Sequence, residues 1–127
     1  MLSTLLFLVA ASVNLLPGIG MLSASRLESL YGVAVQGPDL VILMRHRAVL
    51  LAIVGGILLV SALHPPLRPL GLAVGLLSML SFAAIAWLVG EHNRFLHRVL
   101  IIDVVTSLLL VAAAALDRFS ARGGSAA

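Results

Sequence analysis

The chain has 127 residues, of which 61% are hydrophobic and only 10% are charged, with eight basic and five acidic residues. A mean hydropathy of +1.18 leaves too little polar surface for a soluble domain, so we expect lipid to cover most of the chain. The absence of cysteine excludes disulfides and thiolate sites, and no basic stretch alternates with aromatic residues as in a nucleic-acid-binding surface.

The first apolar stretch predicts a membrane helix over residues 2–21. A cleaved signal peptide is the alternative interpretation. No positively charged region precedes the apolar residues, which favours a helix that is retained.

A polar connection at residues 22–38 leads into a second helix, predicted at residues 39–63. Pro38 and Asp39 indicate its start, because proline fixes a helical φ angle and aspartate can cap free amide groups. This helix would be roughly 36 Å long, more than the ~30 Å hydrocarbon core of a bilayer requires. One end is therefore expected to project beyond the core.

Two more helices are predicted at residues 68–90 and 96–116, and the proline-rich turn at 64–69 makes the second and third helices an antiparallel hairpin. Small residues four positions apart predict close helix packing, inside one bundle rather than across a homodimer: Ala52, Gly56, Gly71 and Gly75. The predicted fold is all-α, an integral membrane four-helix transmembrane bundle over residues 1–116. A flexible tail rich in serine, glycine and alanine is predicted at 117–127.

Four crossings place both termini on one side of the membrane, and the loops at 22–38 and 91–98 on the other. The loop side carries more arginines than the terminal side. By the positive-inside rule, these loops are predicted to face the cytoplasm across a bacterial inner membrane.

A polar group is predicted in the leaflet on the loop side. Arg45, His46 and Arg47 lie six to eight residues into the second helix, and Asp103 lies near the start of the fourth. An ionised group at such depth costs roughly 2.5–3.5 kcal/mol, so we expect Asp103 to face other helices and accept hydrogen bonds from this basic trio. Arg45 and Arg47 point about 200° apart, so one of them should reach for lipid phosphate. The candidate ligand-binding residues are Arg45, His46, Arg47, Asp103, Asn14, Glu91 and His92.

No metal site or cofactor is predicted. His92 and His97 are five positions apart, which on one continuous helix turns them about 140° away from each other. Glycine-rich phosphate loops, serine elbows and suitably spaced carboxylate pairs are missing from the sequence. A purely structural role for the polar group, in which arginines anchor helices to headgroups, is the simplest alternative to a binding role.

Four short stretches carry a resemblance to a known family: Leu30–Val33, Arg45–Leu50, Arg68–Pro69 and Leu77–Phe82. With these, the chain resembles a family of small, uncharacterised bacterial four-helix membrane proteins. Some members carry the name phosphopantetheine adenylyltransferase by automatic transfer. That activity needs a nucleotide-binding α/β domain and a His-x-Gly-His type motif, neither of which is present here, so the resemblance implies topology and no activity.

The favoured functional hypothesis is a non-enzymatic membrane protein that binds a lipid-like ligand or a partner membrane protein through the polar group. Membrane lipids are the expected partners, with a second membrane protein or a homodimer as further options. The alternative is a membrane-embedded enzyme or transporter for a small apolar substrate, with His46 or Asp103 handling a proton.

Overall fold

The computed structural model describes residues 1–18 and 23–125, and within them the fold is all-α, as predicted. In this described part of the chain five α-helices follow one another, with a short 3-10 helix, η2 (Pro65–Leu67), before the fourth. The helices are α1 (Leu2–Leu15), α2 (Ala24–Tyr31), α3 (Pro38–Leu63), α4 (Arg68–Val89) and α5 (Arg94–Gly124).

Three of these stretches are long and apolar enough to cross a membrane: Pro38–Leu63, Pro65–Val89 and Arg94–Gly124. The first apolar helix, Leu2–Gly18, is shorter. Residues 19–21 of the helix predicted at 2–21 lie outside the described residues. Since helices satisfy their own backbone hydrogen bonds, these apolar stretches suit a bilayer, and the chain is a membrane protein.

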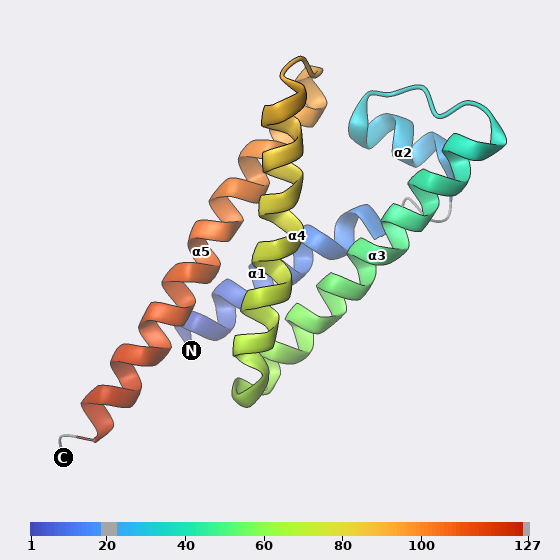
Figure 1. The fold of residues 1–127 in the computed structure, drawn as a ribbon. Helices are drawn as coiled ribbons and strands as arrows, with labels where there is room; N and C mark the ends of the chain where they lie inside the picture. Colours follow the sequence, from blue (N-terminus) through green and yellow to red (C-terminus); the bar gives the residue numbers. More distant parts are fainter. Residues whose placement is uncertain (19–22, 126–127) are drawn as a thin grey trace.

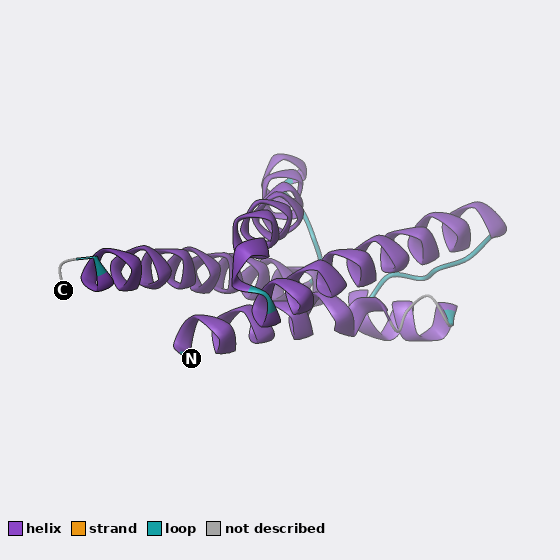
Figure 2. Ribbon diagram, turned by 90° about the horizontal axis from the view of Figure 1, so that it is seen from below, coloured by secondary structure: helices purple, strands orange, loops and turns teal. Residues whose placement is uncertain are grey.

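The helices form an open bundle in which α1 and α4 each pack against α3 and α5. Figure 1 shows α3 and α4 meeting at the turn around η2 and separating toward their other ends. Seen from below in Figure 2, α3, α4 and α5 point in different directions from a shared centre. α2, the loop that follows it and the turn between α4 and α5 lie at one end of the bundle, here called the loop end.

At the centre of the bundle, α4 packs closely against α3 and α5 because two of its residues there are glycines. A Cβ added at Gly75 would lie 2.9 Å from Leu110 Cδ1 and 3.1 Å from Leu58 Cδ2, and one at Gly71 would collide with Ser61. These two glycines pack inside the bundle, as the sequence predicted. Gly56 does not, because a Cβ there meets nothing within 4 Å; the close contact on α3 is at Gly55, against Leu15.

A second packed cluster holds α2 against the bundle at the loop end. Leu27 and Tyr31 of α2 are buried with Val35 and Ala48, and α2 contacts both α3 and α5. The helix ends at Gly32, whose φ of 63° is a left-handed conformation that glycine adopts without steric cost. The predicted polar connection at 22–38 therefore contains a helix that covers part of the bundle.

The predicted flexible tail at 117–127 is wrong for residues 117–124, because α5 continues to Gly124. Asp117 accepts a hydrogen bond of 2.8 Å from Arg68 Nη1, and the two side chains form an ion pair between α4 and α5. The same guanidinium donates to Ser3 Oγ at 3.0 Å and to Thr4 Oγ1 at 2.6 Å. Arg68 of α4 thus contacts both α1 and α5. Its ion pair with Asp117 stabilises the part of α5 that extends beyond the predicted end at residue 116.

Candidate functional site

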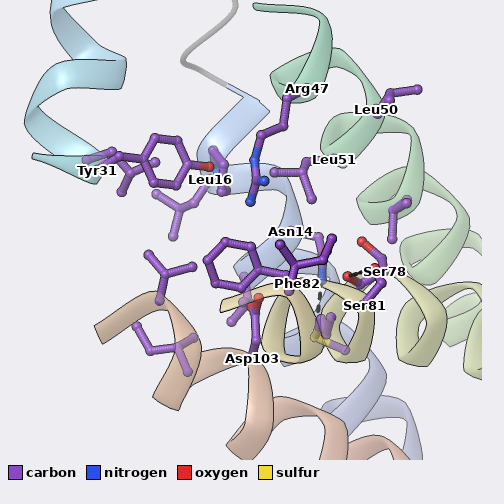
Figure 3. A pocket seen from close by; sticks show the side chains of 18 residues that line it. Asn14, Leu16, Tyr31, Arg47, Leu50, Leu51, Ser78, Ser81, Phe82 and Asp103 are labelled. Carbon is purple, nitrogen blue, oxygen red and sulfur yellow. Dashed lines mark hydrogen bonds between the residues drawn. The ribbon is translucent and has the colours of Figure 1, made fainter. Parts of the chain in front are cut away.

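The loop end of the bundle contains a pocket of about 460 Å³ to which α1, α2, α3, α4 and α5 all contribute. α3 and α4 separate toward this end (Figure 1), and side chains of both helices line the pocket (Figure 3). Most of its lining is apolar, and several lining side chains are also exposed on the outer surface, among them Leu50, Ile85 and Ile102. The polar lining residues are Asn14, Tyr31, Arg47, Ser78, Ser81 and Asp103.

Arg47 projects from α3 into this pocket between two aromatic rings. Its guanidinium carbon lies 5.4 Å from the centroid of the Tyr31 ring and 4.9 Å from that of Phe82. Both distances are within the range of cation–π attraction, which holds the cation in place without neutralising it. Its Nε atom is buried and has no hydrogen-bond partner.

Asp103 of α5 lines the same pocket, half-buried, and the charge of Arg47 acts on its carboxylate. The predicted hydrogen bond between them is not formed: within the described residues no ion pair within 4.0 Å joins Arg47 and Asp103. In the view of Figure 3, the ring of Phe82 lies between the guanidinium and the carboxylate. The pocket therefore holds two opposite charges that do not satisfy each other.

Asn14 reaches the pocket from α1 and is buried. Its Nδ2 donates 2.9 Å to the Ala10 carbonyl oxygen and lies 3.8 Å from Met79 Sδ. On α4, the Ser81 hydroxyl donates 2.9 Å to the Ser78 carbonyl oxygen. These groups add hydrogen-bonding capacity to a wall that is otherwise apolar.

Hydrogen bonds from Asn93, the residue before α5, hold the end of α2 where Tyr31 lies. Asn93 caps that helix, its Oδ1 accepting a 2.9 Å hydrogen bond from the Leu96 amide. The Nδ2 of the same side chain donates to the carbonyl oxygens of Tyr31 at 2.9 Å and Gly32 at 3.2 Å. A single asparagine thus fixes the end of α2, and with it the aromatic face that Tyr31 offers to Arg47.

Of the seven candidate residues, the structure brings Asn14, Arg47 and Asp103 into one pocket, and four others lie outside its lining: Arg45, His46, Glu91 and His92. Arg45 and His46 are exposed on α3, which agrees with the expected divergence of Arg45 and Arg47. Glu91 is exposed in the turn between α4 and α5.

The expectation that His92 and His97 point apart is wrong. Because α5 begins only at Arg94, His92 lies before the helix and folds back over it. The two imidazoles stack with centroids 5.4 Å apart, and His92 Nε2 lies 3.2 Å from His97 Nδ1. No group of three or more metal-ligating side chains occurs in the described part of the chain.

Sequence reasoning missed the residues that surround Arg47, namely Tyr31 and Phe82, and the hydroxyls of Ser78 and Ser81. Phe82 and the serines lie in the part of α4 that follows Arg68, which is apolar and uncharged, and no spacing there distinguishes a pocket residue from a lipid-facing one. Comparison with family models, curated proteins and solved structures found no match for this chain.

Proposed function

We propose that the protein binds an amphiphilic, lipid-like molecule in the pocket at the loop end, with the polar head of the ligand beside Arg47 and Asp103. One observation carries this proposal: a guanidinium held between two aromatic rings, in a largely apolar pocket, with its Nε unpartnered. Pockets of a few hundred Å³ with mostly apolar walls and few polar groups are typical of small-molecule sites.

The depth of the pocket suits an amphiphile. The 26 residues of α3 are about 39 Å long, which exceeds a ~30 Å hydrocarbon core by about 9 Å. Arg47 lies about 14 Å along the helix axis from Pro38. If all of the excess length projects at the loop end, Arg47 would lie about 5 Å below the headgroup boundary. A polar head can reach it there while an acyl chain stays among Leu50, Ile85 and the surrounding lipid.

A binding role is preferred to transport or catalysis. His46, one of the two residues considered for proton handling, does not line the pocket. The opposite half of the bundle is filled by a packed core that includes Phe7, Leu58 and Leu110, and transport would require a polar path through it. A partner helix is also disfavoured as the occupant, because five helices already surround this volume and a flexible chain fills it more readily.

Filling the pocket is expected to expel the ligand. Ser78→Phe places a phenyl group in the pocket wall, whereas Leu77→Phe changes the neighbouring side chain, which is 73% exposed. Native mass spectrometry of the protein extracted from membranes should find an amphiphile retained by the wild type and by Leu77→Phe. Retention should fall tenfold or more in Ser78→Phe. Equal retention by all three proteins would place the binding elsewhere.

We further propose that the protein resides in a bacterial inner membrane with its loop end in the cytoplasm, an orientation supported by the excess of arginines at that end. The chain has no cysteine, so single cysteines can report on orientation. In spheroplasts, a membrane-impermeant maleimide is expected to label Pro66→Cys at once and Gln36→Cys only after lysis. The reverse labelling pattern would show that the loop end faces outward.

A further inference from the structure

We infer that the preferred ligand is a zwitterionic phospholipid whose head carries N–H donors, as in phosphatidylethanolamine. This inference rests on the proposed function and concerns the chemistry of the head. The pocket contains one cation, Arg47, and one carboxylate, Asp103, so its net charge with both ionised is zero. A ligand that matches both groups must present an anionic oxygen and a cationic hydrogen-bond donor together.

The guanidinium side of the pocket suits a phosphate. Tyr31 and Phe82 occupy positions around the cation and leave no carboxylate within ion-pairing distance among the described residues. A guanidinium is planar and presents parallel N–H groups, which match two phosphate oxygens at once. At low dielectric, a charge-assisted hydrogen bond of this kind is much stronger than in water.

The carboxylate side suits an ammonium. The backbone carbonyl oxygen of Asp103 accepts a 2.7 Å hydrogen bond from Ser107 Oγ, and within residues 1–18 and 23–125 its side chain forms no hydrogen bond. The side-chain oxygens therefore remain available to accept N–H donors. A primary ammonium offers three such donors, whereas the quaternary ammonium of a choline head has none. A purely anionic head would leave Asp103 unpaired and bring a second negative charge toward it.

Phe82 lines the pocket together with both charged groups. In the view of Figure 3 its ring lies between Arg47 and Asp103, and the Arg47 guanidinium carbon is 4.9 Å from the ring centroid. A head that reaches around this ring can contact both charges. Two unpaired charges in an apolar wall are costly, and a zwitterion that pairs with both relieves that cost.

The test uses a methylation series of lipids in which the number of N–H donors falls step by step, together with one anionic lipid. The full-length protein, delipidated in detergent, is titrated with phosphatidylethanolamine, its N-methyl and N,N-dimethyl derivatives, phosphatidylcholine and phosphatidylglycerol, all with the same acyl chains. Affinity is expected to fall along the methylation series, by tenfold or more from the ethanolamine to the choline lipid, and to be lowest for phosphatidylglycerol.

Two variants assign this selectivity to Asp103. Asp103→Asn is expected to remove most of the difference between the ethanolamine and choline lipids, whereas Asp39→Asn, at an exposed position in the first turn of α3, should preserve it. Equal affinities across the series, or tightest binding of phosphatidylglycerol, would overturn the inference while the proposed function stands, provided that Ser78→Phe weakens all of the lipids. Binding that Ser78→Phe leaves unchanged would refute the proposed function itself.

Discussion

Replacing Arg68 with leucine is expected to lower the free energy of unfolding by about 2–4 kcal/mol. The wild-type guanidinium donates hydrogen bonds to Ser3, Thr4 and Asp117, and its carbon lies 5.8 Å from the centroid of the Phe7 ring. Leucine removes all of these contacts and leaves the Asp117 carboxylate without its ion-pair partner. The effect is smaller than for a fully buried pair, because the Asp117 side chain is 33% exposed.

The unfolding free energy can be measured by circular dichroism during titration of mixed micelles with a denaturing detergent. Asp117→Asn keeps an oxygen acceptor for Arg68, so its loss should be smaller, about 1 kcal/mol. Arg118→Leu removes the exposed arginine next to Asp117 in the sequence and should shift the unfolding transition little. An Arg68→Leu protein as stable as the wild type would mean that this cluster does not hold α1, α4 and α5 together.

Replacing Arg47 with leucine is expected to weaken binding of a phosphate-bearing amphiphile by about 10- to 100-fold, since a hydrogen bond to a charged group contributes roughly 1.5–3 kcal/mol. Arg47→Lys keeps the charge but loses the planar fork, so an intermediate loss is expected. Arg45→Leu is the matched control, two positions earlier on α3 and outside the pocket lining; it should bind within about twofold of the wild type.

Thermal unfolding with and without lipid separates a binding role from a structural one. Removing a charge that has no ion-pair partner should leave the ligand-free Arg47→Leu protein at least as stable as the wild type. Its stabilisation by lipid should be lost. A lower stability without ligand, combined with an unchanged response to lipid, would assign Arg47 to packing alone.

Secondary structure in this chain follows closely from local sequence. Pro38, Asp39 and the proline-rich turn after Leu63 set the limits of α3, which begins one residue before the prediction and ends where it was predicted. The long apolar stretches predict helices because a bilayer offers no partners to backbone amides and carbonyls. The end of α5 was not predictable in this way, because Asp117 pairs with Arg68, 49 positions earlier in the chain.

The candidate site was predictable in its location but not in its composition. Burial cost and chain direction place Asp103 and the basic trio in one leaflet, and the angle between Arg45 and Arg47 shows that only one of them can face inward. The choice between them depends on how α3 is rotated about its axis, which its packing against α1 and α4 decides. The positions of Tyr31 and Phe82 likewise depend on contacts between separate helices.

By itself, then, the sequence determined an all-α membrane protein and predicted Asp103 near the basic residues of the second helix, because apolar length and the cost of buried charge are properties of each segment. Only the tertiary structure decided that Arg47 is the inward arginine, that Tyr31 and Phe82 lie against it, and that α2 covers the loop end. Those outcomes follow from helix rotation and from side chains that meet across the bundle, which no single segment encodes.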